Sequence, residues 1–398
     1  MCKRPSPSVS RGGAAGFLCS IALAGCAVNP TCPPVATQPS RAFQYEHASW
    51  TDLPGWSSDT VQEVWPAYLA SCRDLRFRPG WSEVCAAAQG IAPASGAAEI
   101  RGYFQQYFEP YRLQKGTGAK AEDTGLVTGY YEPLLRGAHK ASAEFNTALY
   151  SPPQDLLTID LSSLYPELKG KAVRGRLDGN RVVPYYTRAD LAADPALRGR
   201  ELVWVDSAVD AFVLEIQGSG RVQLEDGETI RILYADQNGQ PYHSIGRYLV
   251  DKGLLTVEQA TMPGIRAWLE ANPERMQEVL DANPSVVFFK EMPLGNPEDG
   301  PKGAESVALT PGRSIAVDAA YVPLGAPVFL ATTFPASDAP LERLVIAQDT
   351  GGAIRGAPRA DFFWGIGTEA REMAGKMRQS GEMWLLWPRV LALPHPPK

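Results

Sequence analysis

The sequence has few histidines and no excess of basic residues. It contains only four histidines, and no group of His and Cys residues has the spacing of a metal site. Acidic residues exceed basic ones, with 44 Asp and Glu against 38 Lys and Arg. Phosphate binding needs a clustered basic surface, which this balance does not favour. We therefore expect no metal, no cofactor and no nucleic-acid partner.

A long apolar run is also missing near the N-terminus. The apolar stretch Ala14–Gly25 is too short to span a bilayer, and it follows three basic residues between positions 3 and 11. The stretch ends in Leu23-Ala24-Gly25, followed by Cys26, and these four residues resemble the lipobox of bacterial lipoproteins. The resemblance implies that residues 1–25 are a signal peptide and that acyl chains on Cys26 anchor the protein in a membrane. An ordinary signal peptide with an incidental cysteine is the alternative.

The residues after the predicted cleavage site indicate a destination. The residue after Cys26 is Ala27 and not an aspartate. This resembles lipoproteins that are sent to the outer membrane and face the periplasm. Cleavage leaves 35 Lys and Arg against 44 Asp and Glu, a formal charge of −9. Residues 26–46 are rich in proline and predict an extended tether.

Cysteines are few as well. Of the six in the sequence, Cys26, Cys32, Cys72 and Cys85 remain after cleavage. Cys72 and Cys85 could form a disulfide in an oxidising compartment or stay as two buried thiols, because sequence does not supply the geometry. Cys32 lies in the tether and has no evident partner.

The folded part alternates between helical and strand-like patterns. Residues 59–71 and 97–113 show helical spacing, and an aromatic stripe in the second segment (Phe104, Tyr107, Phe108 and Tyr111) predicts core packing. Residues 125–135 and 211–235 look like strands, with a hairpin turn at 225–228. Helical patterns return at 243–281, and most of the final third is strand-like except 369–379. Many short strands with Gly and Pro turns favour a β-barrel core.

The segment 344–367 carries the strongest chemical signal. An apolar strand delivers Asp349 to a glycine-rich turn, and Asp361 follows beside Phe362, Phe363 and Trp364. An acid beside aromatic surface suits a sugar site, because rings stack on sugars and an apolar wall raises the pKa of the acid. The alternative is two solvated loop aspartates beside core aromatics.

Five segments together resemble one family, the membrane-bound lytic murein transglycosylase A family. They occur in the family's order and cover roughly 125–390: TGYYEP at 128–133, QGSG at 217–220, SIG at 244–246, NPSVVFFK at 283–290, and the block 349–367. The resemblance implies a mainly β chain with helices, in which a double-psi β-barrel carries an inserted second β-rich domain and a glycan groove lies between them. It places the barrel at 47–136 and 236–398, the insert at 137–235, and a three-aspartate module at about 305–390.

The resemblance also implies an activity. The family cleaves the β-1,4 bond between N-acetylmuramic acid and N-acetylglucosamine of peptidoglycan without water and leaves 1,6-anhydro ends. The enzyme class implied is a peptidoglycan lytic exotransglycosylase, with internal cleavage as the alternative. By motif match, Asp361 is the acid that protonates the leaving oxygen and then accepts the C6 hydroxyl proton. Asp349 is expected to stay ionised beside it and to raise its pKa.

Other residues match substrate-binding positions of the family. They are Thr128, Tyr130, Gln217, Ser219, Gly220, Asp318 and Trp364. Several also have a purely structural interpretation: a strand of mixed burial for Thr128 and Tyr130, a bend for the 217–220 segment, and a barrel position for Asp318. The structural alternative for Asp349 is an acceptor in the glycine-rich turn that follows it.

Two other functions fit parts of the same pattern. A non-catalytic peptidoglycan-binding outer-membrane lipoprotein would keep the aromatic residues without needing a protonated Asp361. A hydrolytic muramidase would need a second carboxylate to activate water, and Glu132 and Glu215 are the spare candidates. The expected partner is a glycan strand of peptidoglycan. By analogy with the family, proteins of murein synthesis or scaffolding proteins are further candidate partners.

Overall fold

The computed structural model describes residues 43–395, except 93–94, 117, 166–167, 169–172 and 193–194. The predicted signal peptide, Cys26, Cys32 and most of the tether lie outside the described residues. Within the described part, no helix has both the length and the apolar composition that crossing a membrane requires.

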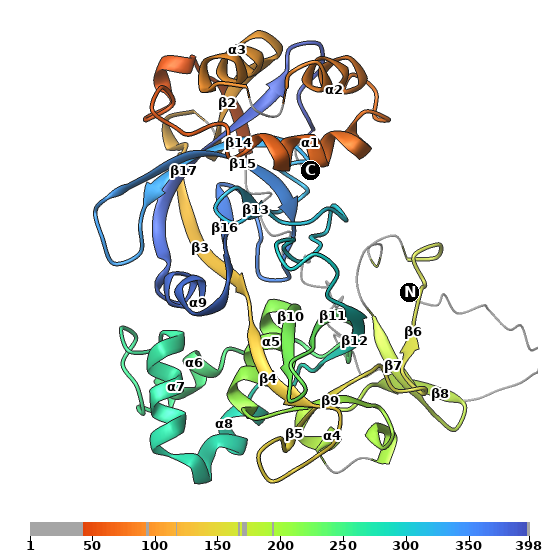
Figure 1. Ribbon diagram of the computed structural model, residues 1–398. Coiled ribbons are helices and arrows are strands. Elements are labelled where there is room, and N and C mark those ends of the chain that lie inside the picture. Colours follow the sequence, from red (N-terminus) through yellow and green to blue (C-terminus); the bar gives the residue numbers. More distant parts are fainter. Residues whose placement is uncertain are drawn as a thin grey trace, which may run out of the picture. The chain divides into compact units, whose positions relative to one another are not determined.

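A closed barrel is the first of two β-rich parts. Within the described residues, its strands are β3 (Thr124–Glu132), β13 (Ser314–Ala316), β14 (Pro327–Thr333), β15 (Pro340–Asp349), β16 (Arg359–Ile366) and β17 (Arg378–Pro388). They are hydrogen-bonded in the order β17-β14-β15-β13-β16-β3, and a further pairing of β3 with β17 closes the ring (Figure 1). Closure pairs the strand edges that an open sheet would expose. Strands β1 (Phe43–His47) and β2 (Phe108–Lys115) extend the sheet from β17.

Three helices cover the barrel at the end drawn uppermost in Figure 1: α1 (Trp65–Leu75), α2 (Ser82–Gln89) and α3 (Ala97–Tyr107). A disulfide between Cys72 and Cys85, with Cα atoms 5.4 Å apart, joins α1 to α2. The predicted helix 97–113 is shorter than expected, because β2 begins at Phe108 and pairs with β17. Phe104 and Phe108 are both fully buried in the core, as the aromatic stripe predicted.

The second β-rich part contains a six-stranded sheet in the order β12-β11-β10-β4-β9-β5, counted over the described residues. Its strands are β4 (Leu134–Ala138), β5 (Thr147–Tyr150), β9 (Glu201–Val205), β10 (Ser219–Leu224), β11 (Thr229–Gln237) and β12 (Val287–Pro293). A small separate sheet is formed by β6 (Leu157–Thr158), β7 (Arg174–Asp178) and β8 (Arg181–Pro184). The expectation of a mainly β chain with helices, a barrel and a second β-rich part is confirmed.

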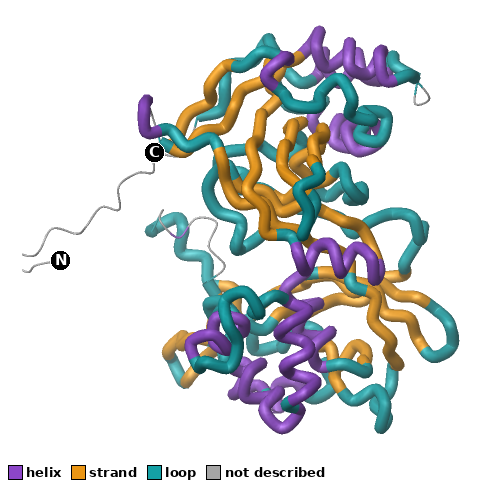
Figure 2. Tube along the Cα trace, turned by 90° about the vertical axis from the view of Figure 1, so that its left-hand side faces the viewer, coloured by secondary structure: helices purple, strands orange, loops and turns teal. Residues whose placement is uncertain are grey.

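Helix α5 (Ala208–Gln217) packs on this second sheet, and α6 (Ile245–Asp251), α7 (Met262–Ala271) and α8 (Met276–Asp281) pack in turn on α5 (Figure 2). The short helix α4 (Arg188–Leu191) packs Leu191 in a cluster with Phe288 of β12. Helix α5 packs Ala211 and Leu214 against the sheet and turns Val209 and Phe212 toward α6–α8. A last helix, α9 (Gly367–Lys376), follows β16 and packs beside β3.

The strand pairing corrects the expected domain boundaries. The insert was placed at 137–235, but the second sheet begins at Leu134 and ends at Pro293. Strand β12 returns to this sheet after α6–α8 and pairs antiparallel with β11, with Tyr234 opposite Phe289. Residues 236–293 therefore belong with the second sheet, and not with the barrel. The local pattern did not reveal this because the pairing joins segments far apart in sequence.

The predicted strand at 211–235 also needs correction. The hairpin is present, since β10 and β11 pair with Gln223 opposite Thr229, but residues 208–217 form helix α5. Ser207 caps this helix by accepting a hydrogen bond from the Asp210 N–H, and Gly218 ends it with φ of 78°. A short apolar run does not separate a strand from a buried helix by periodicity alone.

Candidate active site

Parallel pairing of β16 with β3 brings Asp361 opposite Thr128. The Thr128 hydroxyl donates a hydrogen bond of 2.6 Å to Asp361 Oδ1, and Arg359 Nη2 donates one of 2.9 Å to Thr128 Oγ1. These two bonds hold the carboxyl group in a defined orientation. Sequence analysis missed Arg359. The signal that could have found it is its position two residues before Asp361, which places it on the same face of the strand.

The surroundings of Asp361 favour its protonated form. Burial raises the pKa of Asp361, the Thr128 hydrogen bond and the Arg359 charge lower it, and the nearby Asp349 raises it again, so the net pKa is above its usual value. The expected repulsion from Asp349 is therefore present. Of the neighbouring aromatics, Phe362 faces the barrel core, whereas Phe363 shares the face of Asp361 and lies 5.1 Å from the Tyr130 ring.

Asp349 ends β15 in a cluster of hydrogen-bond donors. Its Oδ1 accepts bonds of 2.9 Å from the backbone N–H groups of Ala304 and Thr350, and its Oδ2 accepts one of 3.2 Å from the Tyr130 hydroxyl. Burial raises the pKa of Asp349 and these donors lower it, and the net pKa is above its usual value. The three donors oppose the effect of burial, and ionisation of Asp349 remains an expectation from the sequence.

The Tyr130 hydroxyl is hydrogen-bonded to Asp349 and lies close enough to Asp361 to be affected by its charge. Burial raises the pKa of its hydroxyl well above the ordinary value, and the charges of Asp349 and Asp361 raise it further. The hydroxyl therefore keeps its proton and acts as a donor. Of the predicted site residues, Thr128, Tyr130, Asp349 and Asp361 form one cluster.

Two other predicted residues take structural positions. Trp364 packs its ring against Phe362 at 5.0 Å and directs its Nε1 toward Met377 Sδ at 3.2 Å, so it does not reach the carboxylates. Strand alternation explains this, because Trp364 shares a face with Phe362 and not with Asp361. Asp318 accepts hydrogen bonds from Ala320 N–H and Gly356 N–H, and thereby holds the loop between the two aspartates.

The predicted binding residues at 217–220 also differ in their positions, since Gln217 lines a cavity and Gly220 is packed in the interior. The Gln217 side chain accepts a hydrogen bond of 3.2 Å from Tyr131 N–H and lines a cavity together with Thr128. Ser219 opens β10 and is half-buried. Gly220 is buried, and a Cβ there would lie 2.5 Å from Leu214 Cδ1. Gly220 matched a substrate-binding position of the family, but a Cβ there would also lie 2.9 Å from the Pro133 carbonyl oxygen, so close packing is what requires a glycine.

Glu132 and Glu215, the other carboxylates considered for activating water, both form ion pairs with arginines. Glu132 is fully buried and pairs with Arg221 at 2.9 Å and Arg231 at 3.4 Å. Glu215 accepts two hydrogen bonds from Arg188, of 2.9 and 2.8 Å. Neither is placed to activate a water molecule. Among the described residues, no group of three or more His, Cys, Asp or Glu side chains could hold a metal ion.

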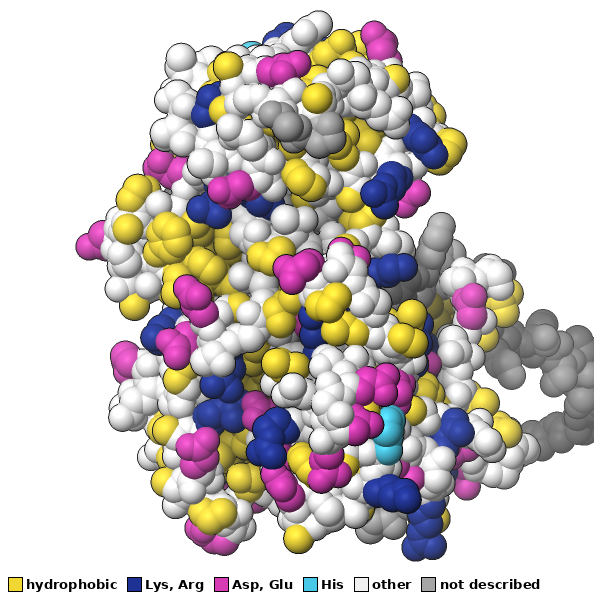
Figure 3. Space-filling model, viewed as in Figure 1, with side chains coloured by type: hydrophobic (Ala, Val, Ile, Leu, Met, Phe, Trp, Pro, Cys, Tyr) yellow, Lys and Arg dark blue, Asp and Glu magenta, His cyan; other side chains and the backbone are white. Residues whose placement is uncertain are grey.

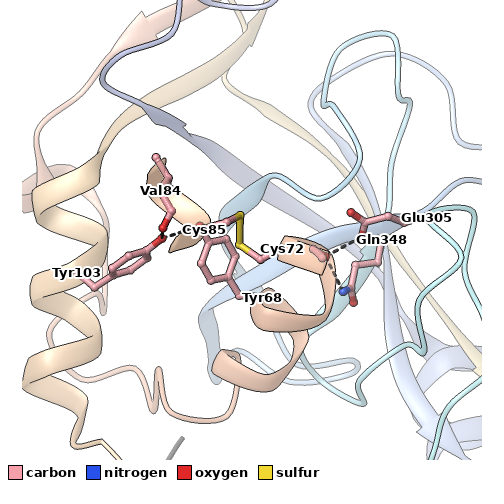
Figure 4. Close-up of a disulfide and its surroundings, with 8 residues drawn as sticks. Tyr68, Cys72, Val84, Cys85, Tyr103, Glu305 and Gln348 are labelled. Carbon is pink, nitrogen blue, oxygen red and sulfur yellow. Dashed lines mark hydrogen bonds between the residues drawn. A yellow bond between two sulfur atoms is a disulfide. The ribbon is translucent and has the colours of Figure 1, made fainter. Parts of the chain in front are cut away.

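A buried polar network supports Asp349 from behind. The Ser71 hydroxyl donates a hydrogen bond of 2.6 Å to Glu305 Oε2 and accepts one of 2.9 Å from Gln348 Nε2. The Glu305 backbone N–H also donates to the Gln348 carbonyl oxygen at 3.0 Å. Glu305 and Gln348 lie together beside the Cys72–Cys85 disulfide (Figure 4). Because Gln348 precedes Asp349 and Ala304 precedes Glu305, this network fixes both the carboxylate and one of its donors.

Replacing Glu305 with glutamine is expected to flatten the pH dependence of stability. Burial raises the pKa of Glu305 to about 7 from a usual value of 4.5. The folded state therefore favours the protonated carboxyl, and wild-type stability falls as pH rises through this range. The difference in unfolding free energy between the two proteins should shift by on the order of 3 kcal/mol from pH 4 to pH 8 in favour of the variant. Urea denaturation at each pH measures it, with the exposed Glu298→Gln as control, and parallel profiles would contradict the prediction.

Comparison with known proteins gives matches over most of the folded chain. A model described as the MltA specific insert domain matches residues 126–290, and one described as the 3D domain matches 313–387. Membrane-bound lytic murein transglycosylase A of Escherichia coli K12 is 32% identical over 275 residues, which cover 67% of each chain. The Vibrio cholerae protein of the same name is 30% identical over 280 residues, covering 69% of this chain and 68% of that one.

Solved structures show the same similarity. A crystal structure of MltA from Neisseria gonorrhoeae is 36% identical with a TM-score of 0.77, and the match covers 89% of this chain and 95% of that one. A crystal structure of E. coli MltA with bound chitohexaose is 28% identical with a TM-score of 0.64, covering 83% of this chain and 90% of that one.

Proposed function

Because the chain belongs to the membrane-bound lytic murein transglycosylase A family, we propose that it cleaves the N-acetylmuramic acid to N-acetylglucosamine bond of peptidoglycan without water. The observation that carries this proposal is the half-buried Asp361, whose pKa is raised and whose carboxyl group is held by Thr128. Such an acid can keep its proton near neutral pH. The related E. coli MltA has been crystallised with a bound sugar oligomer, chitohexaose, which agrees with a glycan substrate.

The proposed reaction uses Asp361 twice. Its Oδ1 accepts the Thr128 bond, so Oδ2 is the oxygen that carries the proton to the substrate. Protonation of the glycosidic oxygen breaks its bond to C1 of the muramoyl residue. The Asp361 carboxylate then accepts the proton of the muramoyl C6 hydroxyl, whose oxygen bonds to C1. The proton returns to Asp361, no water is consumed, and the product has a 1,6-anhydro end.

The neighbouring groups support these steps. The positive charge that develops at C1 is stabilised by negative charge held nearby, and Asp349 with its three donors supplies it. A hydrolase would need a second carboxylate to activate water. Glu132 and Glu215, the two spare carboxylates, are paired with arginines, which favours the reaction without water.

We also propose that the protein is an outer-membrane lipoprotein, anchored through Cys26 and facing the periplasm. The disulfide between Cys72 and Cys85 suits an oxidising compartment. The lipobox-like segment and the proline-rich tether that follows it support the anchor. The relatives from E. coli and V. cholerae are named membrane-bound lytic murein transglycosylase A, which agrees with an anchor.

Product analysis tests the enzymatic proposal. Purified full-length protein is incubated with murein in water labelled with oxygen-18, and the fragments are identified by mass spectrometry. We expect muramoyl ends that lack one water and carry no label. Labelled reducing ends would instead identify a muramidase, and binding without new ends would identify a scaffold protein. Release of small fragments from the start of the reaction would support action at strand ends.

A further inference from the structure

The turn that brings Ala304 to Asp349 sits closely on the end of β15. The Ala304 N–H donates a hydrogen bond of 2.9 Å to Asp349 Oδ1. The next residue, Glu305, donates its N–H to the Gln348 carbonyl oxygen at 3.0 Å. Gly303 approaches the strand so closely that a Cβ there would lie 2.4 Å from the Gln348 carbonyl oxygen and 3.2 Å from Asp349 Cβ. One of the three hydrogen bonds to Asp349 therefore depends on how this turn is docked.

The Glu305 side chain points from this turn into the protein, where the residue is only 7% exposed. Its Oε2 accepts the bond of 2.6 Å from the Ser71 hydroxyl. Its Oε1 is also buried and has no hydrogen-bond partner among the residues that the structure describes. This oxygen lies against Gly325, where a Cβ would be 2.4 Å from it. A neutral carboxyl with its proton on Oε1 suits these surroundings, whereas an ionised one would leave a charged oxygen buried without a donor.

Two charged groups near the C-terminal end of α1 act on this carboxyl. Burial has the largest effect on the pKa of Glu305 and raises it, while the Ser71 bond lowers it. The Arg78 charge lowers it further and the Asp74 charge raises it, and the net pKa is about 7. Both charged groups are exposed, and side chains of both signs lie at the surface over the region of α1 (Figure 3). The side chain that β15 places beside Glu305 is the uncharged Gln348 (Figure 4). Ionisation of Glu305 is therefore opposed by its surroundings and occurs close to neutral pH.

We propose that Glu305 is a positioning residue for the cleavage reaction, which keeps the turn docked while it is neutral and releases the turn when it ionises. This inference rests on the proposed function. A charged Oε1 gains hydrogen-bond donors only if the turn moves away from Gly325, and Ala304 moves with the turn. Asp349 then loses one of its three donors. The negative charge that stabilises the developing charge at C1 is weakened as a result.

The proposal adds a second proton requirement to the reaction. Asp361 must be protonated to react, and Glu305 must be protonated to hold Asp349 in place. One pH unit above a pKa of about 7, only about one tenth of a carboxyl group remains neutral. Glutamine is neutral at every pH, so Glu305→Gln removes the second requirement alone. The ratio of kcat/KM in this variant to that in the wild type should rise by about tenfold between pH 6 and pH 8. The change should appear in kcat and not in KM, because Asp349 acts on the transition state.

The test compares pH profiles of the full-length protein and its Glu305→Gln variant on soluble glycan strands. Initial rates of anhydro-muropeptide formation are measured from about pH 5.5 to pH 8.5. Glu298→Gln, at an exposed position, is the matched control, and its ratio to the wild type should not change with pH. A Glu305→Gln ratio that is also constant would give Glu305 a purely structural role and overturn the inference. The same rise with both variants would indicate a general effect of net charge and would overturn it too.

Hydrogen exchange provides a second test that needs no substituted protein. The Ala304 and Glu305 amides are hydrogen-bonded to the end of β15. After correction for the intrinsic pH dependence of exchange, their protection in the wild type should fall between pH 6 and pH 8. Constant protection of this turn would overturn the inference even if the variant did not fold. Failure of the proposed function would be seen separately, as an absence of anhydro ends with the unsubstituted protein at every pH.

Discussion

Replacing Asp361 with asparagine is expected to reduce turnover of murein by roughly two to four orders of magnitude, the contribution of a general acid or base. The upper end of this range is expected, because we assign both proton transfers to this one residue. Asparagine keeps the size of the side chain and an oxygen that can accept the Thr128 bond. Binding of glycan strands should therefore persist. Initial rates of anhydro-muropeptide formation and a direct binding assay on the same protein measure the two effects.

The pH dependence provides an independent check on this residue. The pKa of Asp361 is raised by burial, so the protonated and active form declines only as pH rises above that folded-state value. The same shift means that ionisation of the native carboxyl lowers stability as pH rises. The Asp361→Asn variant should thus unfold at neutral pH with a free energy at least equal to that of the wild type. An inactive variant that is also clearly destabilised, or one that keeps normal turnover, would count against the assigned role.

Replacing Arg221 with methionine is expected to lower the free energy of unfolding by about 3–5 kcal/mol, the usual cost of breaking a buried ion pair. Arg221 is buried, pairs with the fully buried Glu132, and donates hydrogen bonds to the carbonyl oxygens of Pro297 and Asp299. Burial raises the pKa of Glu132, while the Arg231 and Arg221 charges lower it. Losing the Arg221 guanidinium leaves the Glu132 carboxylate poorly compensated and removes the donor of the Pro297 carbonyl oxygen, whereas the Asp299 carbonyl oxygen keeps its bond from Arg231.

A double variant separates the charge effect from simple loss of packing. Glu132→Gln combined with Arg221→Met should cost less than the two single changes added together, because the second change removes the unpaired charge. Arg247→Met, at an exposed ion pair on α6, is the control and should change stability by less than about 1 kcal/mol. Urea denaturation measures the unsubstituted protein and all four variants. Strict additivity of the two free-energy changes would mean that the ion pair between Glu132 and Arg221 does not contribute to stability, and would contradict the prediction.

The position of this ion pair explains its importance. Strand β3 ends at Glu132 and the second sheet starts at Leu134, so the pair anchors the junction between the two β-rich parts.

The predictable parts of this protein depend on local sequence. Alternating apolar residues and turn residues identified the hairpin between β10 and β11 and most barrel strands, because these signals act between near neighbours. The strand-turn pattern around Asp349 and the aromatic segment after Asp361 identified the two acids for the same reason. The pairing of Cys72 with Cys85 was one of two alternatives, and packing of α1 against α2 brings the two cysteines together.

The remaining features depend on contacts between distant segments. The return of β12 to β11 set the domain boundary, and the register of β16 on β3 brought Arg359 and Thr128 to Asp361. Strand alternation turned Trp364 away from the acids, and close packing accounts for Gly220. Local sequence patterns establish which residue types are available for acid catalysis and in which strands they lie. Which side chains face one another depends on the folded chain, because strand register and helix packing are fixed by contacts between distant segments.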